Sequence, residues 1–218
     1  MFYEEMTEIQ LCHGSKEKIE KPVYGLGNET NDYGKGFYCV SESNIELAKE
    51  WACSPFSAGV EGYVNKYSLN MNDLKVLNLD KYDIIYWIVL TARNRYSNVD
   101  MRLLEQLEKK FILPVEEYDC IYGWRCDDTY SRIIVGFFEE QYSAEAVREA
   151  VHLGYLREQF VLKSKKAFGQ LAYCSSVKVE KYEEYRQRFI KRKSDADNGL
   201  RNCQRNHRIG KYLNDYLE

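Results

Sequence analysis

The strand-like segments of this chain fall into groups at its two ends with helical segments between them, and this distribution most limits the folds open to it. Apolar and aromatic residues occur at strand spacing in residues 9–13, 37–40, 62–70, 74–80, 119–125, 158–164 and 171–179. We expect residues 62–70 and 74–80 to pair as a hairpin, because turn residues separate them. The pattern predicts one α+β domain.

Helical spacing covers most of the remaining chain. Residues 83–111 have a helical pattern with a break near residues 97 and 98, and residues 129–154 read as two helices, the second capped by Ser143. Ser43 and Glu46 fit a capping box at the start of an earlier helix.

These segments define the expected domain organisation. A domain spans residues 1–180, with helical insertions at about 83–113 and 129–154. A basic helical extension, residues 181–218, follows it, and we expect this extension to lie apart from any ligand pocket.

Composition narrows the class of protein. The longest apolar run, residues 84–92, is far shorter than the ~20 residues of a membrane span, and the acidic N-terminus does not resemble a signal peptide. Seven cysteines without a CxxC pair indicate reduced thiols rather than disulfides or a zinc site. We therefore expect a cytoplasmic protein with no membrane partner and no metal.

Charge is unevenly distributed. Residues 178–218 contain 11 Lys or Arg and 7 Asp or Glu, whereas the whole chain has a net charge of −3. A basic tail on an acidic body can attract nucleic acid or an acidic partner, and the segment "RQRFIKRK" is the candidate contact. The simpler interpretation is a solvated helix of mixed charge.

Three short motifs place polar residues at strand ends. The first is His13-Gly14-Ser15, the second is Gly34-Lys35-Gly36-Phe37-Tyr38, and the third is Glu158-Gln159 at the head of a strand. Each alone has an ordinary structural explanation, as a strand end, a tight turn or a polar strand start. Glycines before a strand also allow the backbone to approach a ligand closely.

Taken together and in this order, "LCHGS", "YGKGFYCVSES" and "EQFVLKSKKAFGQLAY" resemble the ADP-ribosyltransferase superfamily, in its diphtheria-toxin and poly(ADP-ribose) polymerase branch. With the "GWRCDDTY" stretch they are similar to an uncharacterised bacterial family assigned to that fold and often found as candidate toxins. The resemblance spans roughly residues 8–180. It implies an ADP-ribosyltransferase-like split β-sandwich with a helical insertion and a C-terminal helical extension.

The resemblance implies roles for individual residues in binding NAD, which would be the substrate. His13 matches the histidine that binds the adenosine ribose, and Gly14 matches the glycine that holds the nicotinamide carboxamide. Tyr38 matches the aromatic residue that packs on the nicotinamide ring. The remaining cofactor-binding candidates in these motifs are Ser15, Gly36 and Phe37.

Gln159 stands where the polymerases have their catalytic glutamate, so the implied catalytic set is His13, Tyr38 and Gln159. An amide can contact a ribose hydroxyl but brings no full negative charge, which favours transfer of one ADP-ribose over chain elongation. Glu158 should point to the opposite face of its strand, which weakens it as a replacement. If the pocket is that of the superfamily, Gln159→Glu should keep or raise NAD cleavage.

The stretch "GWRCDDTY" contains further candidates. Arg125 with Asp127 or Asp128 could contact the pyrophosphate or the acceptor, as could Glu158. The alternative is that the two aspartates cap the helix that begins at Thr129.

The implied function is that of an NAD-dependent mono-ADP-ribosyltransferase of bacterial toxin type. Its acceptor would be a macromolecule, a protein rather than a nucleic acid, and an antitoxin protein would be a further partner. Two alternatives stay open: an NAD glycohydrolase, and a non-catalytic module that binds NAD or another nucleotide. An RNA phosphotransferase is more remote, because fold alone does not fix chemistry.

Overall fold

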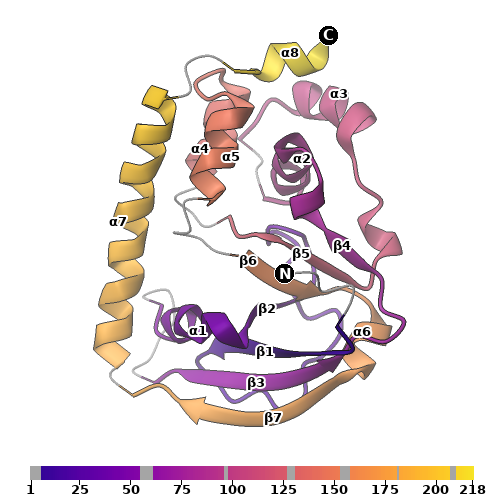
Figure 1. The fold of residues 1–218 in the computed structure, drawn as a ribbon, viewed down its shortest axis with the longest axis vertical. Helices are drawn as coiled ribbons and strands as arrows, with labels where there is room; N and C mark the ends of the chain where they lie inside the picture. Colours follow the sequence, from indigo (N-terminus) through magenta and orange to yellow (C-terminus); the bar gives the residue numbers. More distant parts are fainter. Residues whose placement is uncertain are drawn as a thin grey trace.

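A computed structural model describes residues 6–54, 61–95, 98–126, 131–152, 158–180, 182–206 and 210–218. Seven strands form one mixed sheet in the order β4-β5-β6-β2-β1-β3-β7, with helices packed around it (Figure 1). The strands are β1 Glu8–Ser15, β2 Phe37–Ser41, β3 Tyr63–Asn70, β4 Val76–Asn78, β5 Cys120–Trp124, β6 Glu158–Leu162 and β7 Leu171–Lys178. The architecture agrees with the predicted α+β class.

Eight α-helices and three short 3-10 turns accompany the strands in the described part of the chain. The helices are α1 Ile45–Ala52, α2 Ile84–Arg95, α3 Met101–Phe111, α4 Ser131–Phe138, α5 Ala144–His152, α6 Lys165–Gly169, α7 Tyr182–Asn206 and α8 Leu213–Leu217. The 3-10 turns are η2 Glu42–Asn44, η3 Leu79–Lys81 and η4 Val115–Glu117. None of these helices is long and apolar enough to cross a membrane.

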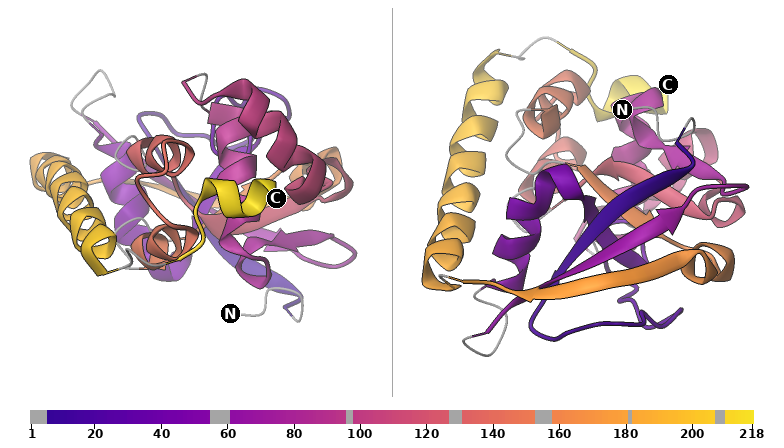
Figure 2. Two further views of the ribbon diagram at one scale, coloured as in Figure 1. Left: turned by 90° about the horizontal axis from the view of Figure 1, so that it is seen from above. Right: turned by 60° about the horizontal axis from the view of Figure 1, so that its bottom comes forward.

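The sheet divides between β1 and β2. These strands pair antiparallel only at Leu11 with Ser41 and at Cys12 with Val40, whereas β1 pairs with β3 along its whole length. On the other side of the division, β2 pairs with β6 and β6 with β5. Figure 2 shows β1, β3 and β7 as one curved group of strands, which separates from the group that contains β6. The division matters because the candidate site lies there.

The main core lies between the β5–β6 side of the sheet and the helices. The sequence of α2 is apolar on nearly all sides, as expected of a helix enclosed by protein, and eight of its residues are buried. Ile121 on β5 and Val161 on β6 belong to the same apolar cluster. This core fixes β5 and β6, and with them the strand end that carries Gln159.

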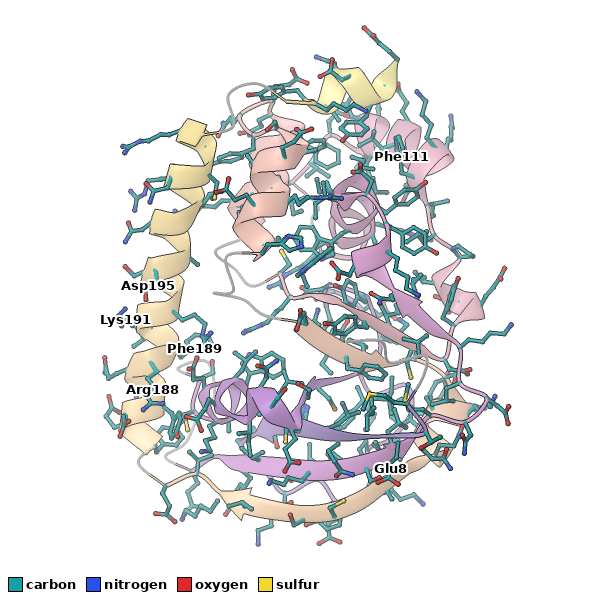
Figure 3. The ribbon with its side chains drawn as sticks, in the orientation of Figure 1. Glu8, Phe111, Arg188, Phe189, Lys191 and Asp195 are labelled. Atoms are coloured by element: carbon teal, nitrogen blue, oxygen red, sulfur yellow. The ribbon has the colours of Figure 1, made fainter. Side chains whose placement is uncertain are left out.

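The C-terminal segment is helical, as predicted, but it shares the main core. Ala196, Leu200 and Cys203 of α7 are buried in the same cluster as α2 and α5, together with Tyr216 of α8. On the outer side of α7, Lys191 pairs with Asp195 (Figure 3). The residues predicted to form an extension therefore contribute to the domain's packing.

Two local predictions are wrong. Residues 62–70 and 74–80 do not form a hairpin, because both edges of β3 are taken by β1 and β7, and β4 pairs in parallel with β5 instead. The capping box also fails, because η2 precedes α1 and Asn44 occupies the cap position without a side-chain hydrogen bond.

Other local predictions are confirmed. The helical stretch that begins at residue 83 is interrupted, with α2 ending at Arg95 and α3 beginning at Met101. Ser143 caps α5, since its hydroxyl accepts a hydrogen bond from the backbone N–H of Ala146.

Candidate functional site

A cavity of about 720 Å³ opens where β1 and β2 separate. Its walls include His13 of β1, Phe37 and Tyr38 of β2, and Gln159 of β6. Volumes of roughly 300–1,000 Å³ are typical of small-molecule sites. The three motif-bearing strands are neighbours in the sheet, which explains how residues so distant in the chain reach one cavity.

The separation of the strands lets side chains from both faces of the sheet enter the cavity. Because side chains alternate along a strand, Phe37 and Tyr38 point to opposite faces. His13 Nδ1 lies 2.7 Å from the carbonyl oxygen of Tyr38, and its ring packs on that of Phe37 at a centroid distance of 4.5 Å. A carbonyl only accepts, so Nδ1 carries the proton and Nε2 of the neutral ring is an acceptor. Burial lowers the pKa of His13, which favours this neutral form.

The hydroxyl of Tyr38 is used to hold the loop that precedes it. It accepts a hydrogen bond from the backbone N–H of Tyr33 at 2.9 Å and donates one to the carbonyl of Gly34 at 2.7 Å. Burial, with a contribution from the Asp32 charge, raises the pKa of Tyr38, so the hydroxyl stays protonated. The ring therefore serves as a fixed wall of the cavity rather than as an acid or base.

Glycine is required at the two positions before β2 for different structural reasons. Gly34 adopts a positive φ of 71°, which side chains disfavour. A Cβ on Gly36 would lie 2.5 Å from Cγ1 of Val161 and 2.9 Å from the carbonyl oxygen of Leu162. Glycine at these positions lets the loop turn into β2 and lie close to β6, beside the cavity.

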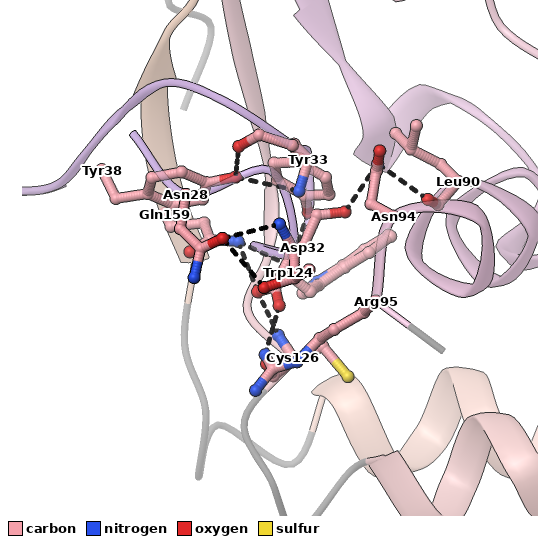
Figure 4. Close-up of polar contacts among 12 residues, drawn as sticks. Asn28, Asp32, Tyr33, Tyr38, Leu90, Asn94, Arg95, Trp124, Cys126 and Gln159 are labelled. Atoms are coloured by element: carbon pink, nitrogen blue, oxygen red, sulfur yellow. Dashed lines mark hydrogen bonds and ion pairs between the residues drawn. The ribbon is translucent and has the colours of Figure 1, made fainter. Parts of the chain in front are cut away.

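Asp32 is a buried carboxylate in the cavity wall and contacts Gln159 directly. Its Oδ2 accepts hydrogen bonds from Nε2 of Gln159 at 2.9 Å and from the backbone N–H of Cys126 at 2.7 Å. Its Oδ1 lies 2.5 Å from Nη1 of Arg95, which also donates to the carbonyl of Cys126. Figure 4 shows Asp32 among these three partners. A negative charge thus lies beside the position where the resemblance places a catalytic residue.

Positive charge predominates elsewhere in the wall. Lys21, Arg95 and Arg125 line the cavity, whereas Asp32 is the one carboxylate among its described wall residues. The guanidinium of Arg125 lies over the ring of Trp51, 4.6 Å from the centroid, which is cation–π geometry. A wall with an excess of cationic side chains and with aromatic rings suits a ligand that is both aromatic and anionic.

The structure brings together six of the predicted site residues. His13, Gly36, Phe37, Tyr38, Arg125 and Gln159 all line the cavity. Asp127 and Asp128 lie outside the described residues.

Gly14, Ser15 and Glu158 are not among the described wall residues, so the predicted contacts of Gly14 and Ser15 with NAD, and of Glu158 with the pyrophosphate or the acceptor, have no support. A Cβ on Gly14 would lie 1.8 Å from the carbonyl oxygen of Ala48, which means that close packing against α1 requires this glycine. The Ser15 hydroxyl donates to the Glu17 carbonyl and accepts from Asn65. Glu158 is exposed while Gln159 is buried, as strand alternation predicts.

The wall residues that the sequence did not single out include Asp32, Trp51, Arg95 and Phe189. Asp32 lies two residues before the glycine motif, and its position there was the one available signal. Phe189 belongs to α7, so the expectation that the C-terminal segment lies apart from the cavity is wrong.

Comparison with known proteins identifies a family. Residues 9–173 match the model of DUF3990, described as a protein of unknown function. The chain belongs to the DUF3990 family. The DUF3990 match includes the cavity-lining residues of β1, β2 and β6, while α7 and α8 follow it. No curated protein and no solved structure matches this chain.

The described residues contain no group of three or more His, Cys, Asp or Glu side chains placed to hold a metal ion. All seven cysteines are free thiols, and six of them are buried. Burial raises the pKa of Cys12 and of Cys53 to about 11.

Proposed function

We propose that this chain is an NAD-dependent mono-ADP-ribosyltransferase with the split-sheet fold of that superfamily. The observation that carries the proposal is the convergence of His13, Tyr38 and Gln159 on one cavity. These residues come from β1, β2 and β6, and β2 lies between the other two in the sheet. The resemblance assigns the same three residues to one ligand.

The wall chemistry is compatible with NAD. Nε2 of His13 can accept a hydrogen bond from a ribose hydroxyl, and the Tyr38 ring provides an aromatic wall for a pyridinium. Arg125 supplies positive charge for the pyrophosphate, as guanidinium groups commonly do, whereas Arg95 is held by Asp32 and the Cys126 carbonyl.

Catalysis by such a site depends on electrostatics. Departure of nicotinamide leaves positive charge on the ribose, and negative or polar groups fixed beside it stabilise that charge. The carbonyl oxygen of Gln159 and the carboxylate of Asp32 are two groups in the described wall that can do this. An amide at position 159 favours a single transfer over chain elongation.

The acceptor is proposed to be a macromolecule, a protein rather than a nucleic acid. The proposal includes a toxin-type role in the cytoplasm of a bacterium, opposed by an antitoxin protein. Most cations of the segment "RQRFIKRK" are in ion pairs: Arg186 with Glu183, Arg188 with Glu184 and Glu46, Lys191 with Asp195, and Arg192 with Glu50. This pairing favours a structural role for the segment over recognition of an acidic partner.

A second candidate is a non-catalytic module that binds NAD or a related nucleotide. It is favoured by one observation: Nε2 of Gln159 is already engaged by Asp32, and the Tyr38 hydroxyl is engaged by the preceding loop. Such a module would keep the cavity and its charge without the chemical step.

Both candidates are tested by incubating the purified protein and a cell lysate with NAD labelled in the adenylate. Transfer predicts label on a macromolecule, with nicotinamide released in equal amount. Free ADP-ribose without labelled macromolecule would identify a glycohydrolase. Binding of NAD by calorimetry without nicotinamide release would identify the non-catalytic module. Absence of binding would contradict both.

A further inference from the structure

Gln159 has one orientation that its surroundings favour. Nε2 donates hydrogen bonds to Oδ2 of Asp32 at 2.9 Å and to the carbonyl of Trp124 at 3.5 Å. An ionised carboxylate and a carbonyl can only accept, so both partners require the NH₂ group on their side. The carbonyl oxygen Oε1 must then point away from Asp32.

Oε1 of Gln159 is the group left for a ligand. Among the described residues it accepts no hydrogen bond, although the side chain lines the cavity. A hydroxyl of a bound ribose could donate to it. The amide thus presents an acceptor to the cavity, as a glutamate would. It does so only while Asp32 and the Trp124 carbonyl hold its Nε2.

Asp32 is itself held firmly in place. Arg95 fixes Oδ1, the backbone N–H of Cys126 fixes Oδ2, and the side chain of Asn94 donates to the Asp32 carbonyl at 3.1 Å. These contacts come from α2 and from the segment after β5, both joined to the main core. The carboxylate is therefore a rigid group rather than a mobile surface charge.

We infer that Asp32 is a positioning residue, which fixes the Gln159 amide with Oε1 toward the ligand while its own charge is paired with Arg95. This inference rests on the proposed function for its effect on the reaction. The hydrogen-bonded pair performs jointly what a single glutamate performs in the superfamily. No step of the reaction passes through covalent contact with Asp32.

The pair changes the expected effect of Gln159→Glu. A glutamate at position 159 would bring a second carboxylate to within hydrogen-bond distance of Asp32, where neither oxygen can donate. The single substitution should therefore lower activity, contrary to the expectation from the sequence. Adding Asp32→Asn removes the repulsion between the two carboxylates and keeps the net charge of the pair at one negative unit.

Four proteins test the inference: wild type, Asp32→Asn, Gln159→Glu and the double variant. We expect each single substitution to lower kcat for nicotinamide release by about 10²-fold, the effect of a misplaced catalytic contact, with a smaller change in KM. The double variant should regain at least about tenfold over the weaker single variant. Glu61→Gln, an exposed carboxylate-to-amide change on the surface, is the matched control and should match wild type.

A double variant no better than the weaker single one would overturn the inference. A readout without ligand separates this result from failure of the proposed function. In a ¹⁵N spectrum, the side-chain NH₂ protons of Gln159 should exchange slowly in wild type and faster in Asp32→Asn. If wild type releases no nicotinamide, the proposed function fails, while slow exchange that Asp32→Asn abolishes still supports the orientation. Equal exchange in the two proteins contradicts it.

Discussion

Nδ1 of His13 donates a hydrogen bond to the carbonyl oxygen of Tyr38 across the gap where β1 and β2 cease to pair. The side chain takes the place of a backbone partner that a continuous sheet would provide. The gap stays open for a ligand, while the carbonyl is not left without a donor. The same residue thus serves the fold and, in the proposed function, the ribose.

The His13 bond predicts a pH dependence of stability. Burial lowers the pKa of His13 in the folded state, so the unfolded chain binds the proton more readily. This contribution to stability is complete above the unfolded pKa of about 6.5 and is lost as pH falls through the folded value. The free energy of unfolding, from urea titrations at pH 7.5 and 5.5, should fall less in His13→Asn than in wild type. An equal fall in the free energy of unfolding between pH 7.5 and 5.5 in the two proteins would contradict this assignment.

Gly14 is predicted to be required by packing rather than by NAD. A Cβ would overlap the backbone carbonyl of Ala48, so Gly14→Ala must displace α1 and should destabilise the fold by at least ~1–3 kcal/mol. Gly169→Ala is the control, because nothing lies within 4 Å of its Cβ position, and it should be neutral or stabilising by up to about 1 kcal/mol. Thermal and urea unfolding of both variants measure this. A stable Gly14→Ala protein would show that α1 can move without cost.

Much of the fold could be predicted from sequence, because it depends on local patterns. The apolar spacing of α2, the break before α3 and the Ser143 cap follow from neighbouring residues. The partners of β3 did not, because an eight-residue strand can pair at either edge and the choice depends on β1 and β7.

The candidate site, like the fold, could be predicted only where it depends on local sequence motifs. The resemblance located His13, Tyr38 and Gln159 because each belongs to a recognisable motif. It missed Asp32 and Arg95, whose contact depends on how the loop before β2 meets the end of α2, over a separation of 63 residues. No local pattern encodes such a contact.

The ion pair between Arg192 of α7 and Glu50 of α1 is predicted to fasten the C-terminal helix to the domain. Both guanidinium contacts are 2.6 Å, and the Glu50 side chain is 4% exposed. Arg192→Met keeps the apolar stem but leaves a buried carboxylate without its partner, which should cost about 3–5 kcal/mol. Urea unfolding should show Glu50→Gln with Arg192→Met to be more stable than Arg192→Met alone. Lys191→Ala, at an exposed pair, should change stability by less than about 0.5 kcal/mol.

Arg125 is predicted to bind the anionic part of the ligand. Arg125→Gln removes the charge beside Trp51 and should weaken ADP-ribose binding about 10- to 100-fold, the value of one charge-assisted hydrogen bond. Binding of adenosine, which lacks the pyrophosphate, should change little. Calorimetric titrations of both ligands measure the difference. Arg93→Gln is the control, since Arg93 pairs with Glu108 and is not among the described wall residues of this cavity. Equal loss for both ligands would count against a pyrophosphate contact.

NAD is proposed to bind in the gap between β1 and β2, and a crystal structure with a hydrolysis-resistant NAD analogue would show whether it does. The nicotinamide ring should lie against Tyr38, an adenosine ribose hydroxyl within hydrogen-bond distance of His13 Nε2, and the other ribose beside Oε1 of Gln159. A second cavity of about 840 Å³, lined by Lys163 and Arg93, lies on the other side of the loop before β2. Analogue bound in that second cavity, or none bound at saturating concentration, would rule out this binding site.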